Sequence, residues 1–200
     1  MTTRIIVPHR GLAAAKTRLS GVLAPDERVA LAERLLRHVL AVAGAGASDV
    51  EVVVISPASS LAGLVGASGA RLVVQRGMGL NAGLQQARRE ALDAGIDLLA
   101  VLHGDLPNLA AGDIEALIGA VATPRGVAIA ADKTGQGTNA LALRPPDVID
   151  FRFGAGSLAA HVAQVEAAGL PLSLVDRPGL AFDLDTPADL ARWLEMGDAA

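Results

Sequence analysis

The chain has 200 residues, of which 52% are hydrophobic and 2% aromatic, with no cysteine and a formal net charge of −4 at pH 7. This length supports one substantial core, so a single domain over residues 1–200 is predicted, while negative charge and scarce aromatic rings disfavour nucleic-acid and anionic-membrane partners. The lack of a signal-like or membrane-spanning apolar run, together with the lack of cysteine, predicts a soluble cytoplasmic protein without disulfide bonds.

Short β-branched runs alternate along the chain with longer segments of helical periodicity. In the clearest helical segment, residues 26–42, apolar side chains recur at helical spacing. Such alternation predicts an α/β fold in three layers, with helices on both faces of a mostly parallel sheet. The second half is less regular, and some antiparallel pairing is expected there. Strands are predicted at residues 4–7, 50–55, 71–74, 98–102, 127–131 and 139–143, and helices at residues 26–42, 81–94, 113–121 and 157–168.

The first predicted strand runs into a basic loop, residues 8–19, that contains Arg10, Gly11, Lys16 and Arg18. Such a loop offers backbone amides and positive charge to the phosphates of a nucleotide, where charge develops during nucleotide transfer. No Walker-type motif is present. The alternative is a solvated basic loop that caps the sheet, and the residues alone leave both interpretations open.

Three carboxylates lie where predicted strands or extended segments end. Asp105 directly follows the fourth predicted strand, and Asp183 and Asp185 are two residues apart, so that in an extended segment they project to the same side. Magnesium prefers hard oxygen ligands and usually takes one or two protein carboxylates. Helix capping is the competing interpretation; it accounts for Thr186 and Asp189 but leaves the other three carboxylates for a metal site.

Two glycine-rich turns follow in the second half, at residues 135–139 and 153–157. The second leads into a predicted helix, and backbone amides at a helix start bind anions well. The alternative for Ser157 is a simple N-cap.

The four histidines are assigned no catalytic role. His103 and His161 have no partner at metal-ligand spacing, His38 lies within an amphipathic helix, and His9 belongs to the basic loop.

Six short motifs occur in an order that spans nearly the whole chain. In this order they resemble the guanylyltransferases that condense GTP with 2-phospho-L-lactate or phosphoenolpyruvate, the CofC/FbiD family of coenzyme F420 biosynthesis, itself similar to the molybdenum-cofactor nucleotidyltransferases. The resemblance implies a single-domain, Rossmann-like fold of the nucleotidyltransferase, or nucleotide-diphospho-sugar transferase, type. The motifs lie at residues 15–20, 79–81, 104–107, 137–141, 153–157 and 183–187.

The resemblance also implies roles for individual residues. Magnesium is expected between the carboxylates, the basic loop is expected to face GTP, and the glycine-rich turns are expected to hold the phosphorylated acid. These expectations assign catalysis to Lys16, Arg18 and Asp105, metal binding to Asp105, Asp183 and Asp185, nucleotide binding to Arg10, Gly11, Lys16, Arg18 and Asn81, and acid binding to Thr138, Gly154 and Ser157.

The chain departs from the family pattern at two places. Family members usually carry Val-Lys where this chain has His9 and Arg10, and Ala where it has Gly104. Arg10 retains the positive charge, but its forked geometry differs from that of lysine.

The reaction implied is attack by a phosphate oxygen of the acid on the α-phosphorus of GTP, with release of pyrophosphate. Phosphoenolpyruvate is favoured over 2-phospho-L-lactate because the arginine- and alanine-rich composition suggests a GC-rich genome. The next enzyme of the pathway is an expected partner. The alternatives are a nucleotidyltransferase of the same fold with another nucleotide or acceptor, such as a sugar-alcohol phosphate or molybdopterin, or a non-catalytic nucleotide-binding regulatory domain.

Overall fold

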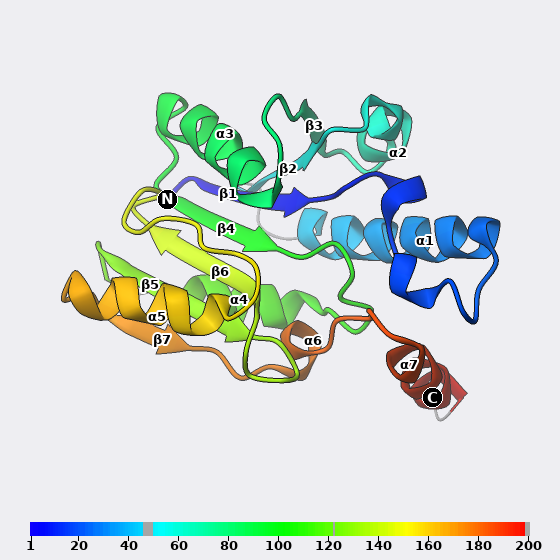
Figure 1. Ribbon diagram of the computed structural model, residues 1–200. Helices are drawn as coiled ribbons and strands as arrows, with labels where there is room; N and C mark the ends of the chain where they lie inside the picture. Colours follow the sequence, from blue (N-terminus) through cyan, green and yellow to red (C-terminus); the bar gives the residue numbers. More distant parts are fainter. Residues whose placement is uncertain (46–49, 122, 199–200) are drawn as a thin grey trace.

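The computed structural model describes residues 1–45, 50–121 and 123–198, which form a seven-stranded sheet between helices (Figure 1). The strand order across the sheet is β3-β2-β1-β4-β6-β5-β7. The strands are β1 (Thr3–Pro8), β2 (Val50–Ser56), β3 (Arg71–Val74), β4 (Leu98–Leu102), β5 (Gly126–Ala131), β6 (Thr138–Arg144) and β7 (Leu172–Leu174).

Strand β6 runs antiparallel to both of its neighbours, β4 and β5, whereas the other paired strands are parallel. The antiparallel pairing expected in the second half is therefore confirmed. Because β6 is reversed, its first residue, Thr138, lies at the edge of the sheet where β1 and β4 end. The backbone shows this directly, since the amide of His103, just after β4, donates to the Asn139 carbonyl at 3.1 Å.

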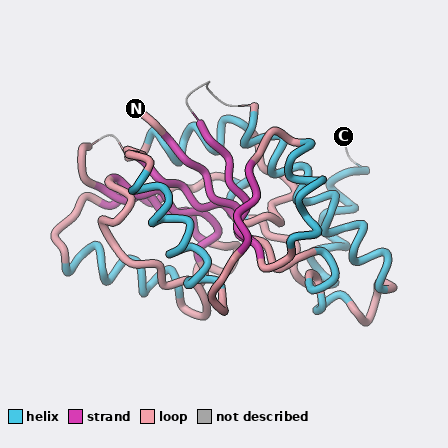
Figure 2. Tube along the Cα trace, turned by 90° about the horizontal axis from the view of Figure 1, so that it is seen from above, coloured by secondary structure: helices cyan, strands magenta, loops and turns pink. Residues whose placement is uncertain are grey.

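Helices cover both faces of the sheet, as the view from above shows (Figure 2). Buried side chains of α1, α2 and α4 pack against one face, and those of α3 and α5 pack against the other. The helices are α1 (Pro25–Gly44), α2 (Ala62–Ala67), α3 (Leu80–Asp93), α4 (Ala111–Gly119), α5 (Ser157–Ala167), α6 (Pro178–Ala181) and α7 (Pro187–Asp198), with 3-10 turns at Leu12–Ala14, Thr17–Leu19 and Ser59–Leu61.

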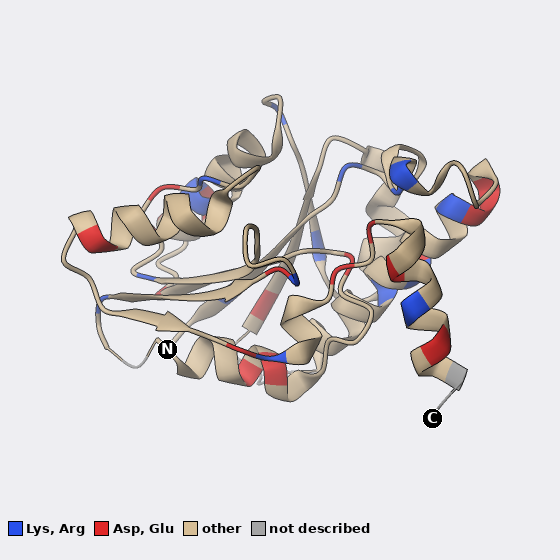
Figure 3. Cartoon of the chain, turned by 60° about the horizontal axis from the view of Figure 1, so that its bottom comes forward, with Lys and Arg blue, Asp and Glu red and all other residues tan. Residues whose placement is uncertain are grey.

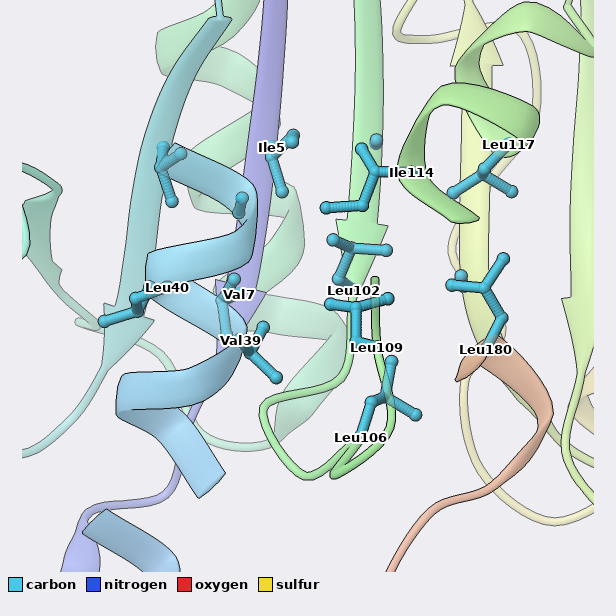
Figure 4. Close-up of a cluster of buried hydrophobic side chains, with 14 of the residues drawn as sticks. Ile5, Val7, Val39, Leu40, Leu102, Leu106, Leu109, Ile114, Leu117 and Leu180 are labelled. Carbon is cyan, nitrogen blue, oxygen red and sulfur yellow. The ribbon is translucent and has the colours of Figure 1, made fainter. Parts of the chain in front are cut away.

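Every residue of the central strand β4 is buried, which explains why its sequence is continuously apolar. Leu102 belongs to the cluster that packs under α1 and α4, and Val101 belongs to the cluster on the opposite face. Figure 4 shows the first cluster, where Val39 and Leu40 of α1 lie against the sheet. A parallel sheet buried on both faces requires such runs rather than alternating polarity.

The predicted elements are confirmed, with shifted boundaries. Helix α4 begins at Ala111 rather than Asp113, because the Asp113 carboxylate accepts the amide of Ala110 at 2.9 Å and so occupies the third helical position. The capping interpretation of Thr186 and Asp189 is confirmed at the start of α7, where the Asp189 carboxylate accepts the amide of Thr186 at 2.7 Å. Three short elements, α2, α6 and β7, were not predicted, because segments of three to six residues show no readable period.

No helix in the described part of the chain is long and apolar enough to cross a membrane.

Candidate active site

An open cleft of about 270 Å³ lies beyond the carboxyl ends of β1 and β4. Parallel α/β sheets bind their ligands at this edge. In Figure 3, acidic segments gather in the loops that lead into the C-terminal helix, with basic segments close by. Of the predicted site residues, Arg10, Lys16, Arg18, Asp105 and Asp185 line the cleft.

The Lys16 ammonium joins the two acidic segments. Its Nζ lies 2.7 Å from Asp105 Oδ2 and 3.2 Å from Asp185 Oδ1, and it also donates to the Leu184 carbonyl at 2.5 Å. The Lys16 side chain is only 5% exposed, so all three of its donors are used inside the protein. The exposed Arg18 guanidinium lies 3.1 Å from Asp185 Oδ2. The structure therefore brings four of the predicted catalytic and metal-binding residues together.

Asp183 lies in a second charged group, although it is only two residues from Asp185. Its carboxylate is 3.4 Å from Lys133 Nζ and 3.4 Å from the Asn139 side-chain nitrogen. Lys133 also donates to the Asp183 carbonyl at 2.7 Å and pairs with Asp189 at 2.8 Å. Asp183 and Asp185 consequently face different lysines, which the spacing of two residues did not predict.

One oxygen of Asp105 fits a metal ligand. Asp105 Oδ1 is buried and has no hydrogen-bond partner in the described residues, so it is an acceptor without a donor. Burial alone would raise the pKa of Asp105, but the Lys16 ammonium, with contributions from His103 and His9, holds the pKa below its usual value and keeps the carboxylate charged. A charged oxygen with an unused lone pair is the kind of ligand that magnesium takes.

Residues 1–45, 50–121 and 123–198 contain no group of three His, Cys, Asp or Glu side chains with the geometry of a metal site. Asp105 and Asp185 flank the same ammonium, whereas Asp183 contacts Lys133. Two carboxylates are sufficient protein ligands for magnesium. The three-carboxylate site therefore stays a prediction.

The basic loop presents unused backbone donors. Within the described residues, the amides of Lys16, Thr17 and Arg18 have no acceptor. Lys16 is the one described non-glycine residue with positive φ, 55°, a conformation that costs free energy in an L-residue. Gly11, at φ 96°, donates its amide to His9 Nδ1 at 3.0 Å. Gly11 thus shapes the loop, and the amides without an acceptor come from the next turn.

The two departures from the family pattern lie side by side. A Cβ atom added at Gly104 would lie 3.5 Å from His9 Cδ2 and 3.4 Å from Val7 and Leu36 side-chain atoms. These are ordinary van der Waals distances, so an alanine would fit at position 104 beside the imidazole of His9.

Thr138 and Ser157 form a buried pair across the two glycine-rich turns. The Thr138 amide donates to Ser157 Oγ at 2.9 Å, and both residues are 2% exposed. The N-cap of α5 is Gly156, at φ 68°, and Ser157 is the first helical residue, so the N-cap alternative for Ser157 is wrong. Gly154, at φ 135°, is exposed in the same turn. The three predicted acid-binding residues are therefore adjacent.

Asn81 holds the second turn in place. Its Nδ2 donates to the Phe153 carbonyl, and its Oδ1 accepts the Phe153 amide, both at 3.0 Å. These two bonds use the main donor and acceptor of the side chain, and Asn81 does not line the cleft. Its predicted contact with the nucleoside stays a prediction, and the structure gives the residue a role in placing the acid-binding turn.

Sequence reasoning missed two polar residues at this edge of the sheet. Lys133 holds Asp183 and Asp189, and Asn139 also donates to the carbonyls of Leu180 and Ala181 at 3.0 and 3.1 Å. Lys133 is one of only two lysines in the chain, which was a readable signal. The partners of both residues are more than forty positions away, so spacing could not reveal them.

One buried histidine, His161, and one half-buried histidine, His9, predict that the protein is destabilised by mild acid. Burial lowers the pKa of His9 and His161 to about 4 each, against 6.5 for an unperturbed imidazole. As pH falls from 6.5 toward 4, the unfolded chain takes up protons that the folded chain does not. The free energy of unfolding should therefore fall by roughly 1.4 kcal/mol per pH unit for each histidine. Urea unfolding at pH 7.5, 6 and 5 measures this; a constant value across that range would contradict it.

The fold is shared with solved structures of the nucleotide-diphospho-sugar transferase type. A solved structure of a nucleotide-diphospho-sugar transferase from Desulfovibrio desulfuricans superposes with a TM-score of 0.78 at 18% identity, covering 98% of this chain and 88% of that one. The expected fold type is confirmed.

The family is shown by sequence. Residues 3–199 match the family model described as guanylyl transferase CofC like, and the chain belongs to this family. A phosphoenolpyruvate guanylyltransferase from Sphaerobacter thermophilus is 47% identical, over 95% of this chain and 91% of the relative. A 3-phospho-D-glycerate guanylyltransferase from Phenylobacterium zucineum is 42% identical, over 92% of this chain and 86% of the relative.

Proposed function

We propose that the protein transfers the guanylyl group of GTP to the phosphate of a small phosphorylated carboxylic acid and releases pyrophosphate. The observation that carries the proposal is the convergence of Lys16, Asp105 and Asp185 at the carboxyl edge of the sheet. Positive charge and a buried carboxylate oxygen without a donor therefore lie in one cleft, and both support the proposal. Membership of the guanylyl transferase family supports the choice of nucleotide.

The reaction depends on positioning of the two substrates and on neutralisation of phosphate charge more than on a general base. A phosphate oxygen of the acid attacks the α-phosphorus of GTP, the bond to the bridging oxygen breaks, and that oxygen leaves with pyrophosphate. The attacking phosphate is already largely ionised at neutral pH, so no proton has to be removed by the protein. Lys16 and Arg18, with the unused amides of the basic loop, would stabilise charge on the triphosphate.

A magnesium ion would be held by Asp105 and Asp185, with Asp183 as the third predicted ligand. When bound, it supplies Lewis-acid neutralisation of phosphate charge. Asp105 is suited to this role because Oδ1 is buried, charged and without a donor. The ammonium of Lys16 offsets the negative charge of both carboxylates, so the site can stay folded when no magnesium ion is bound.

Phosphoenolpyruvate is the first choice of acid. Guanylyltransferases named for this substrate include the relatives from Sphaerobacter thermophilus and Rubrobacter xylanophilus, which are 47% and 42% identical. The relative named for 3-phospho-D-glycerate is also 42% identical, and this makes 3-phosphoglycerate the second candidate. If the acid is phosphoenolpyruvate or 2-phospho-L-lactate, the product belongs to coenzyme F420 biosynthesis, and the enzyme that consumes it is the proposed partner.

Pyrophosphate release tests the proposal. With magnesium and GTP, the rate should depend on phosphoenolpyruvate and should be at least tenfold lower with 2-phospho-L-lactate, 3-phosphoglycerate or no acid. ATP and CTP serve as nucleotide controls. Rapid release with 3-phosphoglycerate alone would select the second candidate. No release with any pair, from folded protein that binds GTP, would overturn guanylyl transfer.

A further inference from the structure

His161 is buried at the point where the two acid-binding turns meet. It is 0% exposed, on α5, and its ring packs edge-on against Phe153 with the ring centroids 5.0 Å apart. Both ring nitrogens have partners. The backbone amide of Arg152 donates to Nε2 at 2.9 Å, and Nδ1 lies 3.1 Å from Thr138 Oγ1.

These contacts fix the tautomer of the ring. A backbone amide can only donate, so Nε2 accepts and carries no proton. In the neutral imidazole the proton is then on Nδ1, which donates to the hydroxyl oxygen of Thr138. Burial lowers the pKa of His161 to about 4, and the ring is therefore neutral at physiological pH.

The fixed tautomer leaves two hydroxyl protons unused. Thr138 Oγ1 accepts from His161, and Ser157 Oγ accepts from the Thr138 amide. Each oxygen is thereby occupied as an acceptor and keeps its own proton to donate. In the part of the chain that the structure describes, neither proton has another acceptor, and the amides of Gly154, Ala155 and Gly156 in the adjoining turn have none either.

This donor-only cluster does not itself line the cleft, but it lies next to a residue that does. Phe153, which contacts His161, also lies 5.6 Å from the His103 ring that lines the cleft. Thr138 is followed by Asn139, whose side chain contacts Asp183. The arrangement therefore suits an anion bound beside the proposed metal-binding carboxylates.

We propose that His161 is a positioning residue for the phosphorylated acid: its Nδ1–H holds the Thr138 hydroxyl so that Thr138 and Ser157 both present protons to a carboxylate or phosphate. This inference rests on the proposed function, because it takes the acid to be the ligand of these hydroxyls. It predicts that the bond to Thr138 matters for acid binding and that the bond to Arg152 matters mainly for the fold.

Two substitutions separate these bonds. His161→Asn places an amide donor near the position of Nδ1 and loses the acceptor for Arg152, whereas His161→Gln reaches toward Arg152 and loses the donor to Thr138. The KM for the acid should rise at least tenfold in His161→Gln and stay within about threefold of the parent value in His161→Asn. In both variants the KM for GTP should stay within twofold. His38→Gln, on α1, is the matched control, and thermal unfolding and circular dichroism verify folding.

The affinities of the parent and the two variants for phosphoenolpyruvate and 3-phosphoglycerate are measured by calorimetry with magnesium present, in addition to turnover. Equal acid affinity in the parent and His161→Gln, or equal losses for acid and GTP, would overturn the positioning role. If the parent bound an acid but released no pyrophosphate, only the proposal of guanylyl transfer would be refuted. The ratio of acid affinities between the parent and His161→Gln would still decide the role of His161. A parent that neither binds an acid nor turns over would overturn both proposals.

Discussion

Replacing Asp105 with Asn is expected to lower turnover by roughly a thousandfold and leave the chain folded. The amide keeps the shape of the side chain and an oxygen for Lys16, but it removes the negative charge. The buried position of Oδ1 then holds either a neutral amide oxygen, which is a weaker metal ligand, or an NH2 group, which cannot ligate a cation. Electrostatic groups aimed at transferring phosphates typically have effects of this size.

Initial rates of pyrophosphate release, urea unfolding and magnesium binding by calorimetry test this expectation together. The matched control is Asp147→Asn, which makes the same chemical change at an exposed position in the loop after β6. The Asp105 variant should bind magnesium with GTP at least tenfold more weakly than the control. Near-parental turnover in folded Asp105→Asn would remove this residue from the metal site.

Much of the fold could be predicted because its signals are local. The buried run 98–102 and the periodic segment 26–42 each indicate one element by composition and spacing, and β4 and α1 are found there. Strand order is set by contacts between distant segments, and the reversed strand β6 was anticipated only as unspecified antiparallel pairing. Its consequence, that Thr138 begins at the same edge as the ends of β1 and β4, required the structure.

The candidate site was predictable in its residue types but not in its pairing. Asp105 could be selected because it directly follows a predicted strand, and Lys16 because it lies in the basic loop after another. Their contact could not be predicted, because 89 positions separate them. Asp183 and Asp185 were expected to act on one side, but the turn into α7 directs them to different lysines. His161 showed no sequence signal, since its partners are a backbone amide and a threonine 23 residues away.

The second large effect is expected for Lys16→Met, which should also lower turnover by roughly a thousandfold but, unlike Asp105→Asn, should clearly destabilise the fold. Without the ammonium, the Asp105 and Asp185 carboxylates face each other with no counterion between them, and the Leu184 carbonyl loses its donor. Removing one partner of a buried ion pair is costly, although the partial exposure of Asp185 reduces the penalty, so a loss of about 1–2 kcal/mol in unfolding free energy is expected.

Lys16→Arg separates the charge from its geometry. A guanidinium retains the positive charge and should recover most of the lost stability, but its planar fork cannot meet the same three oxygens that surround a compact ammonium. Its turnover should therefore stay below roughly a tenth of the parental rate.

Arg37→Met, which removes an exposed cation paired with Glu33 on α1, controls for the change in net charge. If Lys16→Arg restored full turnover, any cation at this position would suffice, and turnover would not depend on the three-oxygen geometry. If Lys16→Met itself turned over normally, the positive charge of Lys16 would not contribute to catalysis, because the same variant removes both the charge and the geometry.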